Sequence, residues 1–342
     1  MKLPQLHPNE LKSTKISRER RRRLLFSYLP DWVISIALAG GFFALDKISG
    51  FKRDFSLEDT SLRHPYAVHE RVPNWLLFVI CAAAPVVLLA IINLFTVRTF
   101  WDLHNSYLGL LLSLSVAGVI TQFTKLSVGR PRPDVISRCM PPAGSVDPPF
   151  GLTTASICTQ TDISIFNDGF RSFPSGHSSL SFAGLGFLAF YLAGKLHLFD
   201  KRGYAPKAWI SLFPLCVATL VAISRTMDYR HHWQDVTVGS ILGLTVAYFS
   251  YRQYYPDLAD ELSHRPYSPR VKDDVSESIL PVHNQSQSQG YEGDGRRYDS
   301  FELEGTVQRP GAQQLRDTWK GHDDLGAEDS RVDHDLLSGG RE

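Results

Sequence analysis

The chain has 342 residues, and its 36 lysines and arginines nearly balance 35 aspartates and glutamates, which leaves a formal net charge of +1. The net charge and a mean hydropathy of −0.12 average two unlike parts. Apolar runs fill residues 28–251, whereas the chain beyond residue 256 is polar. No strand-like alternation dominates, and no repeat or nucleic-acid motif is present, so we expect an all-α protein without a nucleic-acid partner.

The N-terminal segment, residues 1–27, is basic. It carries Lys12, Lys15, Arg18 and the run from Arg20 to Arg23 ahead of the first apolar stretch. No convincing small-residue cleavage site follows, so we do not expect a cleaved signal peptide. Clustered basic residues beside a membrane span stay on the cytosolic side, which places this segment in the cytosol.

Six apolar segments follow, each close to the length of about 20 residues that crosses a bilayer. They cover Tyr28–Leu45, Trp75–Phe95, Tyr107–Phe123, Ser179–Ala193, Ala208–Ile223 and Val236–Tyr251. The fourth and sixth are short or interrupted by glycine, and the sixth carries Gly239 and Gly243 at a spacing that lets two helices approach closely. We predict a polytopic membrane domain over residues 28–252 with six transmembrane helices.

An even number of spans returns the C-terminus to the cytosol, and the basic connection 194–207 falls on the same side. The opposite, extracytoplasmic side receives the loops 47–74, 125–178 and 225–234. Cys139 and Cys158 share one of these loops, and a disulfide between them is left open. The polar tail, residues 253–342, lacks the apolar surface that folding needs, so we expect it to be disordered.

Three short motifs at the ends of the apolar segments carry the chemistry. In the first, Lys125 and Arg132 stand seven residues apart. The planar guanidinium of arginine matches two phosphate oxygens at once, and lysine adds a compact charge. Arg130 is a competing partner that spacing alone does not exclude.

The second motif opens a helix. Ser175 suits the N-cap, Gly176 lets the backbone approach an anion, and the free N–H groups of the following turn favour a bound phosphate. His177 stands at this site, where it could donate a proton.

The third motif pairs a histidine with a carboxylate. Asp235 follows His231 by four residues, so a helix start places both on one face. A carboxylate that accepts from one imidazole nitrogen leaves the other free to attack phosphorus. Arg225 could stabilise charge on the phosphate oxygens. The neighbouring His232 lacks the four-residue spacing to Asp235.

The same side chains are also candidates for a zinc site. The set comprises His177, His231, His232 and Asp235. The nearby lysine and arginines would repel a divalent ion, so we expect no cofactor and no magnesium requirement.

Together the motifs resemble the signature of the type-2 phosphatidic acid phosphatase superfamily, and its lipid phosphate phosphatase and diacylglycerol pyrophosphate phosphatase branch in particular. That signature is Lys, six residues, Arg-Pro; then Pro-Ser-Gly-His; then Ser-Arg, five residues, His, three residues, Asp, and it is matched without departure. The likeness covers about Tyr28–Tyr251. It implies a phosphatase/haloperoxidase-like helical core and selects Arg132 over Arg130.

The resemblance also implies a role for each residue. His231 would be the nucleophile that forms a phosphohistidine, Asp235 would orient it, and His177 would protonate the leaving alkoxide. The implied phosphate-binding residues are Lys125, Arg132, Ser175, Gly176 and Arg225.

The expected protein is a metal-independent membrane enzyme that hydrolyses phosphatidate, lysophosphatidate or diacylglycerol pyrophosphate drawn from the bilayer. Its site would be extracytoplasmic and both termini cytosolic, in the vacuole, Golgi, endoplasmic reticulum or plasma membrane of a eukaryote. A sphingoid-base or isoprenoid (pyro)phosphate phosphatase of the same superfamily is an alternative. A non-catalytic phospholipid transporter or scramblase is another, and a homo-oligomer is left open.

Overall fold

The computed structural model describes residues 18–200, 203–269 and 306–307. The expected disorder of the tail from residue 270 onward, and the placement of most of the basic N-terminal segment, concern residues outside this description. Within it the chain is helical and has no strand, and its β-structure is limited to two isolated bridges.

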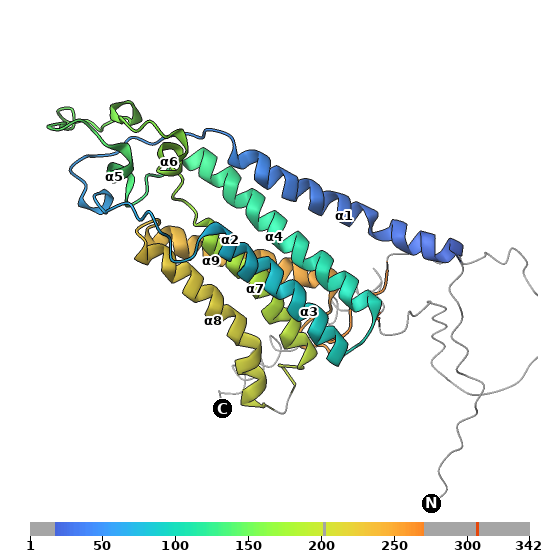
Figure 1. The fold of residues 1–342 in the computed structure, drawn as a ribbon. Helices are drawn as coiled ribbons and strands as arrows, with labels where there is room; N and C mark the ends of the chain where they lie inside the picture. Colours follow the sequence, from blue (N-terminus) through green and yellow to red (C-terminus); the bar gives the residue numbers. More distant parts are fainter. Residues whose placement is uncertain (1–17, 201–202, 270–305, 308–342) are drawn as a thin grey trace, which may run out of the picture.

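Six long helical stretches form the body of the molecule (Figure 1). They are α1 (Arg18–Asp46), α2 (Asn74–Phe78) continued by a π-helical turn (Val79–Ala83) and α3 (Ala84–Phe95), α4 (Phe100–Val128), α7 (Gly176–Lys195), α8 (Ala205–Met227) and α9 (Trp233–Tyr254). Each contains one of the six predicted apolar segments. The short elements are η1 (Thr60–Leu62), α5 (Val135–Cys139), η3 (Ala155–Ile157) and α6 (Ile163–Asp168).

Four of the long stretches in the described chain are long and apolar enough to cross a membrane: Arg22–Asp46, Asn74–Phe95, α4 and α8. The helices α7 and α9, also predicted as spans, do not belong to this group. For α7 the physical reason is its place in the bundle, since it contacts α4, α8 and α9 and 15 of its 20 residues are buried. A helix that meets mostly protein does not need an apolar surface, and serine and glycine serve it well.

The spacing of Gly239 and Gly243 predicts a close helix contact, and the structure shows this contact between α9 and α7. A Cβ at Gly239 would lie 2.6 Å from the carbonyl oxygen of Ser175, and one at Gly243 would lie 2.3 Å from that of Ser179. Both distances are far inside van der Waals contact, so only glycine fits. The N-terminal halves of α7 and α9, which carry the second motif and Asp235 of the third, are thereby packed backbone to backbone.

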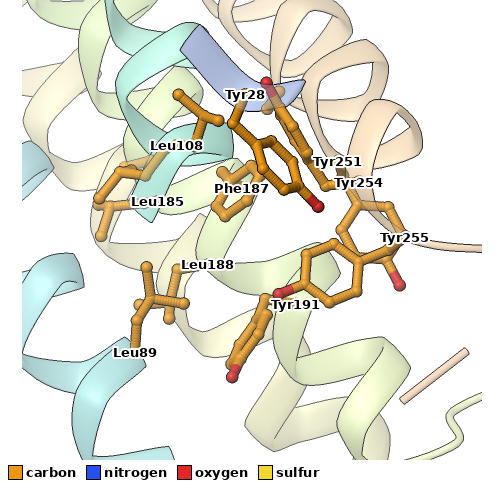
Figure 2. Close-up of a cluster of buried hydrophobic side chains, with 13 residues drawn as sticks. Tyr28, Leu89, Leu108, Leu185, Phe187, Leu188, Tyr191, Tyr251, Tyr254 and Tyr255 are labelled. Atoms are coloured by element: carbon orange, nitrogen blue, oxygen red, sulfur yellow. The ribbon is translucent and has the colours of Figure 1, made fainter. Parts of the chain in front are cut away.

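An apolar cluster with buried tyrosines fixes the helices relative to one another (Figure 2). It draws from α1, α3, α4, α7, α8 and α9 and includes Tyr28, Leu89, Leu108, Leu185, Phe187, Leu188, Tyr191, Tyr251, Tyr254 and Tyr255. The ordered chain extends beyond the predicted boundary at residue 252, because α9 continues to Tyr254 and the Tyr267 N–H donates to the Tyr254 carbonyl at 2.8 Å.

The connections α1–α2, α4–α7 and α8–α9 gather at one end of the bundle, where α5 and α6 also lie (Figure 1). Backbone hydrogen bonds tie them together: the Ser175 N–H donates to the Asp235 carbonyl at 2.9 Å, and the Ser172 N–H donates to the Arg130 carbonyl at 3.0 Å. Cys139 in α5 forms a disulfide with Cys158. All three motifs therefore meet at one end of the molecule.

Candidate active site

The end of α4 delivers the cations of the first motif. Gly129 stops the helix with φ of +57°, and a Cβ there would lie 2.2 Å from the carbonyl oxygen of Phe51. The left-handed conformation and this contact both require glycine. The turn leaves Lys125 in the last helical turn and sends Arg132 back across the same end.

Both cations keep donors that no protein group uses. Lys125 Nζ lies 3.2 Å from the position that a Cβ on Gly176 would take, and among the described residues no ion-pair or hydrogen-bond partner approaches it. Arg132 donates from Nη2 to Asp168 Oδ1 at 2.7 Å, but its buried Nε has no partner. Because buried donors are normally satisfied, the Arg132 Nε points to an anion that completes the site, and the half-buried Lys125 could contact the same anion.

His231 lies in the short α8–α9 connection and is buried. Its Nδ1 is 2.6 Å from the Ser172 carbonyl oxygen, and since a carbonyl only accepts, Nδ1 carries the proton. Nε2 is then the nitrogen with the free lone pair. Burial, together with the charges of Arg132 and Lys125, holds the pKa of His231 well below its usual value of 6.5. The imidazole is therefore neutral at physiological pH, as a nucleophile must be.

The direct hydrogen bond expected between His231 and Asp235 is not formed. His231 Nδ1 lies 4.0 Å from Asp235 Oδ2. The carboxylate instead accepts from the Ser172 hydroxyl at 2.5 Å, the Arg130 guanidinium at 2.6 Å and the His232 backbone N–H at 3.1 Å. Asp235 stands in the first turn of α9 and folds back on the helix start, as carboxylates there commonly do. Ser172 thus contacts both residues, Asp235 through its hydroxyl and His231 through its carbonyl.

The start of α7 matches its predicted form. The Ser175 hydroxyl accepts from the Ser178 backbone N–H at 3.4 Å, and Gly176 begins the helix beside Lys125. His177 donates from Nε2 to the Val72 carbonyl oxygen at 2.9 Å, so its Nδ1 is the nitrogen left for proton transfer. A carbonyl of a neighbouring segment thus fixes His177, as the Ser172 carbonyl fixes His231.

Arg225 lies in the last turn of α8 and is buried. Its Nε donates to Ser224 Oγ at 3.1 Å, Nη1 to Glu70 Oε2 at 2.7 Å and Nη2 to Asp228 Oδ2 at 3.1 Å. All three nitrogens are engaged, but each Nη has a second hydrogen for another acceptor.

The predicted residues converge on one place. His231 interacts electrostatically with Arg132, Lys125 and His177, and His177 interacts in turn with Arg225. Arg130, the competing partner in the first motif, is turned away toward Asp235 and Gln234. The arrangement sets two oriented imidazoles among three cations.

Sequence reasoning missed several residues of this cluster. Asp168, from α6, pairs with Arg132, Arg138 and Arg230. Burial acts to raise the pKa of the Asp168 carboxyl, but the surrounding arginines and Lys125 hold it well below its usual range. Arg230 could have been noticed because it adjoins His231.

Glu70 and Ser172 were missed for a different reason. Glu70 accepts from Arg225, and its Oε1 lies 3.0 Å from Arg230 Nη2. Both residues sit in irregular loops outside any recognisable spacing. In the described chain, no three His, Cys, Asp or Glu side chains gather as a metal ion would need.

The chain is similar to several known proteins. The family model of the PAP2 superfamily matches residues 106–258. "Probable diacylglycerol pyrophosphate phosphatase 1" of Schizosaccharomyces pombe is 38% identical over 270 residues, which cover 78% of this chain and 94% of that protein. Lipid phosphate phosphatase 2 of Arabidopsis thaliana is 42% identical over 243 residues, covering 70% of this chain and 82% of that protein.

Diacylglycerol pyrophosphate phosphatase 1 of Saccharomyces cerevisiae is 40% identical over 220 residues, covering 63% of this chain and 75% of that protein. No solved structure matches the chain. The region matched by the family model runs from α4 to just beyond α9 and holds all three motifs. The helices of membrane-spanning length and these relatives make the chain an integral membrane protein, and it belongs to the PAP2 superfamily.

Proposed function

We propose that this protein is a lipid phosphate phosphatase that hydrolyses phosphomonoesters and pyrophosphates of membrane lipids through a phosphohistidine and without a metal ion. The observation that carries the proposal is the Nε2 of His231. Nε2 bears a free lone pair because Nδ1 of the same ring is held by the Ser172 carbonyl oxygen at 2.6 Å, and the imidazole lies among cations with unused donors. The names of the relatives supply the substrate class.

The reaction proceeds in two steps. First, His231 Nε2 attacks phosphorus as the bond from phosphorus to the lipid oxygen breaks. His177 takes part as an imidazolium, protonated on both nitrogens when the phosphate is bound, and gives its Nδ1 proton to that oxygen. The lipid therefore leaves as an alcohol, or as a phosphomonoester when the substrate is a pyrophosphate. Water then attacks the phosphohistidine and His177 accepts its proton, which releases inorganic phosphate and restores His231.

The remaining motif residues bind the phosphate. Lys125, Arg132 and Arg225 stabilise the negative oxygens in the transition state, a task that magnesium performs in many other phosphoryl-transfer enzymes. Ser175 and Gly176 present the N-terminal N–H groups of α7. Asp235 is a positioning residue, since it holds Ser172, whose carbonyl holds His231.

The membrane placement follows from the same arrangement. We infer six spans, with α7 crossing at the centre of the bundle and α9 packed against α7 and α4. The motif end then faces the extracytoplasmic or lumenal side of a eukaryotic membrane. The disulfide between Cys139 and Cys158 at this end supports that side, because disulfides persist in oxidising compartments.

Phosphate release by the purified full chain tests the function. We expect hydrolysis of phosphatidate and diacylglycerol pyrophosphate in excess EDTA. His231→Ala should slow it at least about a thousandfold, as removal of a nucleophile does elsewhere. The matched control His232→Ala alters the neighbouring imidazole and should keep most of the activity. Wild-type rates in His231→Ala, or a loss in EDTA that magnesium restores, would contradict the proposal.

A further inference from the structure

One carboxylate from outside the motifs reaches into the phosphate-binding cluster. Glu70 lies in the connection between α1 and α2, close to the start of α2. Its Oε2 is 2.7 Å from Arg225 Nη1 and 3.9 Å from His177 Nε2, and its Oε1 is 3.0 Å from Arg230 Nη2. A planar, negatively charged group therefore already occupies one edge of the cluster.

We propose that Glu70 is an internal competitor of phosphate: its carboxylate holds part of the phosphate site in the substrate-free protein, and the phosphate displaces it. This inference rests on the proposed function of the same site. Carboxylate and phosphate oxygens accept from an arginine in the same two-point geometry. A phosphomonoester brings more charge and a third oxygen, so it can win the exchange.

Exposure and location identify Glu70 as the partner that moves. Arg225 pairs with two carboxylates, Glu70 and Asp228. The Asp228 side chain is 1% exposed and follows directly on α8, whereas the Glu70 side chain is 22% exposed and belongs to a loop. Moving Glu70 toward water is the less costly change, because it does not leave a charge buried and unpaired.

The loop around Glu70 is anchored, so the exchange needs only a side-chain movement. The Val72 carbonyl holds His177 and the Ala67 carbonyl accepts from Arg230 at 2.9 Å. The Arg71 backbone N–H donates to Asp228 at 2.9 Å. A carboxylate tethered this closely has a high effective concentration at the site. It would return after hydrolysis and help expel inorganic phosphate.

The proposal predicts the sign of an affinity change. Glu70→Gln removes the competing charge but keeps the size of the side chain, so inorganic phosphate should bind about tenfold tighter, equivalent to one decade in Kd. Glu70→Asp keeps the charge with a shorter reach and should bind phosphate with intermediate affinity. Glu58→Gln is the matched control, because Glu58 is an exposed glutamate of the same loop that does not contact the cluster.

The experiment is a calorimetric titration of purified full chain with inorganic phosphate at fixed ionic strength. All variants carry His231→Ala so that no covalent step intervenes. Unchanged or weaker binding in Glu70→Gln overturns the proposal, and Glu70→Ser repeats the test if Glu70→Gln is poorly folded by thermal unfolding. If His231→Ala binds phosphate and the added Glu70→Gln does not change the affinity, the competitor role of Glu70 is refuted but the proposed function is not. If no variant binds phosphate, the proposed phosphate site, and with it the proposed function, is contradicted.

Discussion

Two buried charge clusters stand at opposite ends of α4, about 35 Å apart at 1.5 Å per residue. At one end Asp102 accepts from Lys195 at 2.6 Å, Tyr191 at 2.6 Å, Asn93 at 2.7 Å and Tyr255 at 3.0 Å. One acid faces one cation, and every acceptor position is used. The Asp102 carboxylate is thus fully satisfied, as in a structural ion pair.

The motif end uses similar ingredients differently. Lys125 makes no direct ion pair or hydrogen bond with a described residue, Arg132 keeps a buried Nε without an acceptor, and Arg225 is paired with a glutamate that is partly exposed. The contrast indicates that unused donors, rather than buried charge as such, separate a binding site from a structural ion pair. Substitution of one cation at each end should therefore have opposite consequences.

The largest effect is expected from Lys195→Met at the Asp102 end. It leaves the Asp102 carboxylate buried without its cation, and breaking a buried pair in this way costs about 3–5 kcal/mol of unfolding free energy. The Lys195 and Asp102 side chains are 2% and 0% exposed, so solvent cannot compensate. Thermal unfolding in detergent measures the loss. The kcat/KM of the folded fraction should stay within about twofold of wild type, and a large fall there would contradict the contrast.

Arg132→Gln, at the motif end, should lower activity strongly and stability only slightly. It removes a donor to the phosphate, and loss of one transition-state donor typically lowers kcat about 100- to 1000-fold. Asp168 retains Arg138 and Arg230 as partners, so we expect a much smaller change in thermal unfolding than for Lys195→Met. Steady-state hydrolysis of phosphatidate provides the rate, with Arg53→Gln, an exposed arginine of the first loop, as control.

The pH dependence of kcat/KM gives a finer test of the interaction between Arg132 and His231. His231 must be neutral to attack, and burial and the charges of Arg132 and Lys125 hold its pKa well below 6.5. The acid limb of kcat/KM for the wild type should accordingly lie below pH 6.5. In Arg132→Gln one repelling charge is gone, so the pKa of His231 rises and the limb moves to higher pH. Ionisation of the substrate affects both proteins equally and therefore cancels in the comparison. An acid limb at the same pH in both proteins would show that Arg132 does not act on His231.

The smallest effect is expected from Gly176→Ala. The new Cβ would lie 3.2 Å from Lys125 Nζ, and the end of a lysine side chain can yield by a few tenths of an ångström. We expect KM to rise less than about tenfold, which corresponds to less than about 1.4 kcal/mol of binding free energy. Gly40→Ala in α1 is the matched control, because nothing lies within 4 Å of its Cβ. Equal KM values in the two variants would argue against a tight Lys125–Gly176 contact.

The sequence predicts much of the fold because helices obey local rules. All six apolar segments lie within long helices, and the Gly239–Gly243 spacing marks the contact between α7 and α9. The serines and glycines of α7 suit its central position, which depends on neighbours distant in the chain.

The candidate site likewise has a part that the sequence predicts and a part that it does not. Lys125, Arg132, His177, Arg225 and His231 are brought together at one end. Spacing correctly places Asp235 near His231, yet it cannot foresee that the carboxylate caps α9 and hydrogen-bonds to Ser172 rather than to the imidazole. Glu70 meets Arg225 from a position 155 residues earlier, in a loop without a motif, so no local rule could predict it.

The nucleophile is the central claim, and trapping the covalent intermediate tests it most directly. Purified wild-type protein is mixed with radiolabelled phosphatidate, quenched in alkali, where phosphohistidine survives, and mapped by mass spectrometry. We predict a phosphoryl group on His231 in the wild type and none in His231→Ala. A phosphoryl group on another residue, or full activity in His231→Ala, would contradict the mechanism.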